Sequence, residues 1–140
     1  MVRLAASITA AALLLAASPL LAQSNQTLNK TIKKDTESMV NVHANAYKPR
    51  PGMQNCEQGG TVVIEVTSPP KNGSVSTRPT KTKDKDCSNE LTGTGIYYKP
   101  KPGFTGTDTF TYVRTEENMR AVSKAGGPQG NRVVNITVQP

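Results

Sequence analysis

The sequence predicts an all-β domain, with an antiparallel β-sandwich as the favoured architecture and a small barrel as the alternative. Short segments rich in β-branched and aromatic residues recur along the chain with alternating polarity. Eleven glycines and ten prolines separate these segments. Beyond the first 22 residues no segment shows the 3.6-residue hydrophobic period of an amphipathic helix. Together these patterns are typical of a small domain built from short strands and tight turns.

The first 22 residues have the features of a secretory signal peptide. Arg3 precedes an apolar run, 4–21, made mostly of alanine and leucine, and small Ala22 suits the last position before cleavage. A membrane anchor is the less favoured alternative, because the run is barely long enough to span a bilayer. We therefore expect an exported chain that begins at Gln23 and is periplasmic or secreted, not an integral membrane protein. Loss of Arg3 lowers the net charge from +7 to +6.

Residues 23–37 are polar and offer little to bury, so they predict an exposed N-terminal arm in front of a domain at 38–140. The two cysteines, Cys56 and Cys87, predict one disulfide in an exported chain. A reactive or metal-binding pair is less favoured, because the chain has no CxxC spacing and a single histidine.

The expected strands follow in chain order. Apolar residues alternate from Met39 to Ala46, and the clearest strand is 61–67, where Val62, Ile64 and Val66 share one face. Further strands are expected at 95–99, 108–114 and 132–138. Asn72–Gly73 predicts a tight hairpin turn, with the return strand starting at Val75. Residues 77–90 and 115–131 are expected to be exposed connections, the first of them held by the disulfide.

One segment carries a long and specific pattern, Y-x-P-x-x-G-F-x-G-x-D-x-F-x-Y, matched at Tyr98, Pro100, Gly103, Phe104, Gly106, Asp108, Phe110 and Tyr112. The pattern resembles the bacterial immunoglobulin-like, cadherin-like domains that recur in large surface and secreted proteins. The resemblance extends over about 39–139 and implies an immunoglobulin-like sandwich. It implies no single function, because such domains serve as spacers, adhesive modules and neighbours of carbohydrate-binding domains.

Each matched residue also has an expected structural role. Gly103 and Gly106 permit a tight corner, and Phe104 and Phe110 supply core volume. Asp108 is placed to accept backbone N–H bonds at the start of a strand. Tyr112 resembles the tyrosine-corner residue whose hydroxyl ties a loop to the sheet.

The sequence gives little support for catalysis or for a bound metal. The lone histidine, His43, has no nucleophile motif nearby, and the carboxylates are scattered. Asp84 and Asp86 offer two oxygen ligands to calcium, but lysines flank them. Met39 and His43 would give copper only two ligands. We therefore expect a protein that is not an enzyme and has no metal and no cofactor.

The basic surplus indicates an anionic partner. The candidate binding residues are Lys81, Lys83, Lys85, Lys99, Lys101, Arg120 and Lys124. The favoured function is a non-catalytic exported binding module for lipopolysaccharide, an anionic polysaccharide or another anionic envelope component. Specific nucleic-acid binding is not expected, because Tyr97 is the one aromatic residue near these cations. The alternative is an assembly protein that docks on an envelope protein through a sheet edge or the 115–131 loop; the charge could also serve solubility alone.

Overall fold

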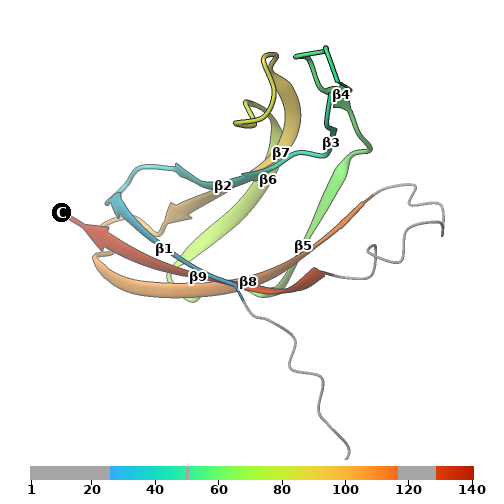
Figure 1. Ribbon diagram of the computed structural model, residues 1–140. Coiled ribbons are helices and arrows are strands. Elements are labelled where there is room, and N and C mark those ends of the chain that lie inside the picture. Colours follow the sequence, from blue (N-terminus) through green and yellow to red (C-terminus); the bar gives the residue numbers. More distant parts are fainter. Residues whose placement is uncertain (1–25, 50, 117–128) are drawn as a thin grey trace, which may run out of the picture.

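The computed structural model describes residues 26–49, 51–116 and 129–140, and within these ranges the chain is all-β (Figure 1). Nine strands are described there, and two sheets pack face to face around one hydrophobic core. None of the described residues forms a helix long and apolar enough to cross a membrane. The predicted signal peptide lies outside the described residues.

Two sheets and one short ribbon account for all the described strands. The four-stranded sheet has the order β1 (Gln26–Lys33), β9 (Gln129–Gln139), β8 (Gly106–Glu116), β5 (Val62–Ser68). The three-stranded sheet has the order β2 (Ser38–His43), β7 (Leu91–Pro100), β6 (Gly73–Thr82). The ribbon pairs β3 (Ala46–Tyr47) with β4 (Glu57–Gln58).

The predicted sandwich of two β-sheets is confirmed. The pairing is antiparallel except between β1 and β9, which run parallel. The first sheet is therefore mixed, where the sequence predicts antiparallel pairing throughout.

The interpretation of 23–37 as an exposed arm is wrong for most of its length. Residues 26–33 form β1, which pairs along its whole length with β9. Most of its side chains are exposed, but Leu28 is half-buried and Ile32 is buried in the core. The remaining stabilisation of β1 comes from backbone hydrogen bonds to β9, which cannot be predicted from amino-acid composition.

The predicted hairpin at Asn72–Gly73 is also wrong. Strands β5 and β6 lie in different sheets, so the turn joins the two layers instead of two paired neighbours. Neither residue has the positive φ that a tight hairpin turn requires. Gly73 is needed for another reason, because a Cβ at this position would overlap the ring of Tyr98.

The connection predicted at 77–90 is shorter than expected, because β6 continues to Thr82. Pro79 lies within this strand and pairs with Thr94 of β7. A proline is tolerated here because β6 is an edge strand, where the missing N–H breaks no ladder.

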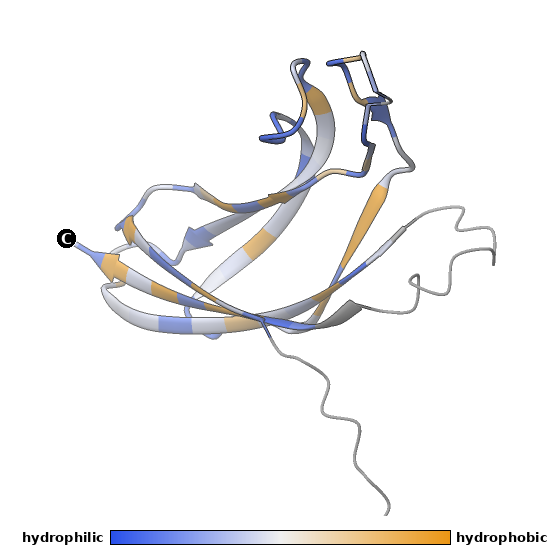
Figure 2. Cartoon of the chain, viewed as in Figure 1, coloured by the Kyte–Doolittle hydropathy of each residue, from blue (hydrophilic) through white to orange (hydrophobic). Residues whose placement is uncertain are grey.

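The core lies between the sheets and is built on aromatic rings. Hydrophobic and polar residues alternate along the strands, as Figure 2 shows, so that each strand turns one side toward the opposite sheet. The largest fully buried side chains are Tyr98, Tyr112, Phe110, Ile96, Ile136, Val40 and Val134. Phe104 packs against this core from its margin. Both phenylalanines of the pattern thus supply core volume, as predicted.

One buried carboxylate organises the corner between β7 and β8. Asp108 accepts the backbone N–H groups of Lys71 (3.0 Å), Asn72 (2.8 Å) and Thr109 (2.9 Å), and the hydroxyl of Tyr98 (2.8 Å). The predicted role of Asp108 is confirmed and extended, because it also holds the β5–β6 turn. Gly103 (φ 74°) and Gly106 (φ 122°) make the corner itself, as expected.

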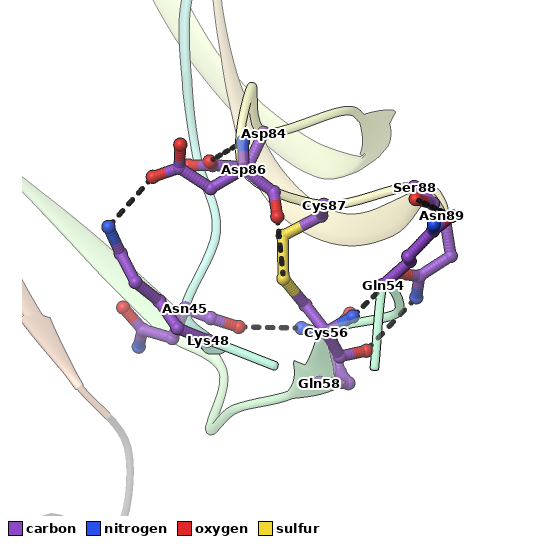
Figure 3. The surroundings of a disulfide bond; sticks show 10 residues. All are labelled: Asn45, Lys48, Gln54, Cys56, Gln58, Asp84, Asp86, Cys87, Ser88 and Asn89. Carbon is purple, nitrogen blue, oxygen red and sulfur yellow. Dashed lines mark hydrogen bonds and ion pairs between the residues drawn. A yellow bond between two sulfur atoms is a disulfide. The ribbon is translucent and has the colours of Figure 1, made fainter. Parts of the chain in front are cut away.

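A small lobe stands apart from the main core at the top of Figure 1, and the disulfide lies at its centre. Cys56 and Cys87 form the predicted bond and pack with Leu91 (Figure 3). The Asn89 side chain both accepts from the backbone N–H of Cys56 (2.8 Å) and donates to its carbonyl (3.0 Å). We call this region, residues 46–49, 51–58 and 83–90 with strands β3 and β4, the disulfide lobe.

Replacing Asp108 by asparagine should destabilise the domain by about 2–3 kcal/mol at pH 7, because an amide cannot accept all four bonds. Burial alone would raise the pKa of Asp108, but the bonds from Tyr98 and the backbone outweigh it and hold the pKa below its usual value. The carboxylate therefore stabilises the fold above about pH 4, and this contribution is lost as the pH falls through the lowered pKa. In urea unfolding, the difference between Asp108→Asn and the wild type should shrink in acid; a constant difference would contradict this account.

Removing the disulfide should lower the free energy of unfolding by about 3–4 kcal/mol, because the bond closes a long loop in the unfolded chain. The cysteines are 31 residues apart. The double variant Cys56→Ser, Cys87→Ser, compared with the wild type by thermal unfolding with and without reductant, checks this. Reductant should destabilise only the wild type.

Candidate functional site

The five described lysines of the predicted binding set form two separate groups. Lys81, Lys83 and Lys85 lie at one end of the β6–β7 pair, whereas Lys99 and Lys101 lie at the other. Lys81 is opposite Thr92 and Lys99 is opposite Ser74, so about 23 Å of strand β7 separates the groups. Arg120 and Lys124 lie outside the described residues.

Acidic residues accompany the first group. Lys83 and Lys85 alternate with Asp84 and Asp86 in the disulfide lobe, and Asp86 pairs with Lys48 at 2.7 Å. Figure 3 shows this ion pair beside the disulfide. The Nζ atom of Lys81 donates to the hydroxyl of Thr92 (2.9 Å). The local positive charge is therefore largely compensated.

The second group is joined by lysines that are distant in sequence. The Nζ atom of Lys101 donates to the carbonyl of Lys71 (2.7 Å), which brings the β5–β6 and β7–β8 turns together. The N–H of Gly103 donates to Asp35 (2.7 Å), which adds the β1–β2 turn and its Lys34. We call these four residues, Lys34, Lys71, Lys99 and Lys101, the basal lysines.

Few carboxylates oppose the basal lysines. In the part of the chain that the structure describes, the ion pairs are Lys48–Asp86 and Arg78–Glu37, and neither involves a basal lysine. The nearby Asp35 accepts a backbone N–H, and Asp108 lies buried beneath the turns. The basal end therefore presents a net positive surface, which the disulfide lobe does not.

Tyr97, the aromatic residue that the sequence predicted near the cations, is covered by an arginine. The guanidinium of Arg78 lies over the ring of Tyr97 at 3.3 Å, and the hydroxyl of Tyr97 is bonded to Thr80 (3.0 Å). Glu37 holds the same guanidinium at 3.0 Å. A sugar ring or a base could stack on Tyr97 only by displacing this arginine.

A second polar cluster lies between the sheets, and the sequence prediction for Tyr112 was wrong there. Among the described residues, the hydroxyl of Tyr112 contacts strand β2 and not a loop: it contacts Nε2 of His43 (2.7 Å) and accepts a hydrogen bond from Nδ2 of Asn41 (2.9 Å). A β-bulge between Met39 and Asn41 brings these β2 side chains inward. Tyr112 thus links the two sheets. The loop-anchoring role falls to Tyr98 through Asp108.

The contacts define the protonation of His43. Oδ1 of Asn41 accepts the N–H of Val42 (2.9 Å), so Nδ2 faces the ring and lies 3.2 Å from Nε2 of His43. An amide nitrogen only donates, so Nε2 is the acceptor and the neutral ring carries its proton on Nδ1. Burial, followed by the charges of Arg114 and Arg132, lowers the pKa of His43 to about 4. His43 is therefore neutral at pH 7.

The two arginines continue the inward-facing series of their strands. Val138, Ile136 and Val134 point into the core from β9, and Arg132 is the next residue in that alternation. Arg114 follows Phe110 and Tyr112 in the same way on β8, and its Nη2 donates to Asn45 (3.1 Å). Sequence reasoning missed both arginines and Asn41, although extending the two-residue period by one step would have placed the arginines inside.

His43 separates two cavities. One, of about 340 Å³, is lined by Arg132, His43, Tyr112, Asn41 and residues 26–28 of β1. The other, of about 440 Å³, lies toward the disulfide lobe and is lined by Arg114, Lys48 and Lys83 among others. No three His, Cys, Asp or Glu side chains converge on a possible metal position in the described ranges.

The chain matched no protein-family model, no curated protein and no solved structure. The resemblance of the sequence pattern to immunoglobulin-like, cadherin-like domains therefore stays a prediction.

The histidine should titrate near pH 4 instead of 6.5, and the protein should lose stability as the pH falls from about 6.5 toward 4. In that range the unfolded chain binds a proton that the folded chain refuses. His43 is the one histidine in the chain, so its proton NMR signal needs no assignment. His43→Gln should remove this part of the pH dependence. A titration midpoint near 6.5 would contradict the buried, neutral assignment.

Proposed function

We propose that this protein is a non-catalytic exported binding module, an immunoglobulin-like domain that contacts an anionic envelope component or an extracellular acidic polysaccharide. The observation that carries the proposal is the convergence of the basal lysines from three turns and the end of strand β7. The predicted signal peptide and the disulfide support export, because disulfides persist in oxidising compartments.

Hydrogen bonds hold the backbone around the basal lysines in place. The backbone of Lys71 is held by Asp108, and Lys101 is bonded to Asn72 through its backbone N–H (2.9 Å). The ammonium groups are exposed, while the turns that carry them are tied to the core. A polymer with regularly spaced anionic groups can contact several such charges at once, and each weak contact adds to the others.

The chemistry favours charge recognition over sugar stacking or catalysis. Arg78 covers the ring of Tyr97, the aromatic residue that the sequence predicted beside the lysines. His43 is engaged by Tyr112 and Asn41, and no serine, threonine or cysteine hydrogen-bonds to its ring among the described residues. Neither arrangement supplies an activated nucleophile.

The assembly alternative has less support. The edge strand β6 contains Pro79 and Lys81, and the edge strand β1 exposes Lys30 and Lys33. Prolines and lysines on edges oppose pairing with another strand. Most of the 115–131 loop lies outside the described residues.

Two matched triple variants test the proposal. Lys71→Gln, Lys99→Gln, Lys101→Gln removes three of the four basal charges, and Lys81→Gln, Lys83→Gln, Lys85→Gln removes as many from the other group. Binding to lipopolysaccharide vesicles or to polygalacturonate, measured by co-sedimentation, should fall roughly tenfold in the basal variant and much less in the other. Wild-type binding should weaken steeply as the salt concentration is raised from 50 to 300 mM, because the screening length of the solution then shortens roughly twofold.

Equal losses in the two variants would reject the basal lysines as the contact surface. Salt-insensitive recovery of one envelope protein, with no binding to either polyanion, would reject the proposed function in favour of assembly.

A further inference from the structure

We propose a second binding site, separate from the basal lysines: the cavity between β1 and β2 takes a single phosphate group, with Arg132 as its principal cation. This site goes beyond the proposed function. It lies between the sheets, whereas the basal lysines are exposed on three turns and at the end of strand β7. Tyr112 on its wall is four residues along β8 from Asp108, toward the opposite end of that strand.

The walls of the cavity come from both sheets. Gln26, Thr27 and Leu28 of β1 and Arg132 of β9 belong to one sheet, and Asn41 and His43 of β2 belong to the other. Strands β1 and β2 are edge strands of their sheets, so the cavity lies at an open side of the sandwich. A small solute can enter there without parting any paired strands.

Among the described residues, the charges that act on this cavity are positive. The groups whose charges shift the pKa of His43 are Arg114 and Arg132, and the same two arginines act on Tyr112. None of the described residues that line the cavity carries a carboxylate. A half-buried guanidinium in such a place favours an anion, because its field is weakly screened by water.

The donors suit an oxyanion. A guanidinium presents several N–H groups in a planar fork that matches phosphate oxygens. Gln26 and Thr27 of β1 line the same cavity. The opposite wall is rigid, because Asn41, His43 and Tyr112 are bonded to one another. This bonded wall holds the shape of the site while the arginine provides the charge.

The volume of the cavity indicates which phosphate compounds fit it. About 340 Å³ is more than one phosphate ion needs, which leaves room for a small organic group. The site therefore suits a phosphomonoester as well as inorganic phosphate. An extended polymer fits the exposed basal surface better than this cavity between strands.

The single histidine makes the test direct. Inorganic phosphate is titrated into the protein while the His43 ring signals are followed by NMR, with sodium chloride at matched ionic strength as the blank. Phosphate should shift these signals in a saturable way and raise the pKa of His43 by about one unit or more, because an anion nearby favours the imidazolium. Ribose 5-phosphate is the second probe, and saturation by both would show recognition of the phosphate group with its substituent accommodated. Saturation by phosphate alone would restrict the site to the free ion.

Matched arginine variants locate the site. Arg132→Gln should abolish the phosphate-induced shift, whereas Arg132→Lys should retain part of it and Arg114→Gln most of it, because Arg114 lines the other cavity. The variant Lys71→Gln, Lys99→Gln, Lys101→Gln should bind phosphate like the wild type. Phosphate binding in the cavity therefore does not depend on whether the basal lysines bind a polyanion. An unmoved His43 signal in the wild type, or an unchanged response in a folded Arg132→Gln variant, would overturn the proposal.

Discussion

The fold depends on one buried carboxylate that bonds to three parts of the chain. Asp108 joins the β5–β6 turn, the start of β8 and the ring of Tyr98 on β7. Tyr98 packs over Gly73, and its ring stacks in parallel with Phe110 in the core (centroids 6.4 Å apart). A buried charge is costly unless its oxygens are fully bonded, and here four donors meet it. The same corner supports the turns that carry the basal lysines, so the core and the candidate surface share one anchor.

The two sheets are joined differently at the other end. There the hydroxyl of Tyr112 lies between β2 and β8, and two arginines replace the valines and aromatic rings that fill the rest of the interior. Hydrophobic packing therefore closes one end of the sandwich, while a polar, positively charged interior marks the other. The disulfide lobe compensates for the smaller apolar core there by linking two loops covalently.

The sequence predicted what depends on local pattern. Alternating residues found β5, β8 and β9, and the long pattern found the corner at Gly103, Gly106 and Asp108. Prediction from the sequence failed where contact with a distant part of the chain determines the structure of a segment. The polar residues 26–33 form a strand because they pair with β9. The turn at Asn72–Gly73 crosses between the two sheets, and the ring of Tyr98 fills the space beside Gly73. The gathering of Lys34 and Lys71 beside Lys101 depends on tertiary contacts that no local spacing encodes.

The parallel pairing of β1 with β9 also bears on the order in which the chain can fold. The first described strand pairs with the last, across a separation of 106 residues. Contacts so distant in sequence form late, because the intervening chain must be ordered first. A chain that crosses a membrane with its N-terminus leading cannot complete this sheet until its final strand has emerged. Under the proposed export, this topology would leave one edge of the sandwich open until the final strand has crossed.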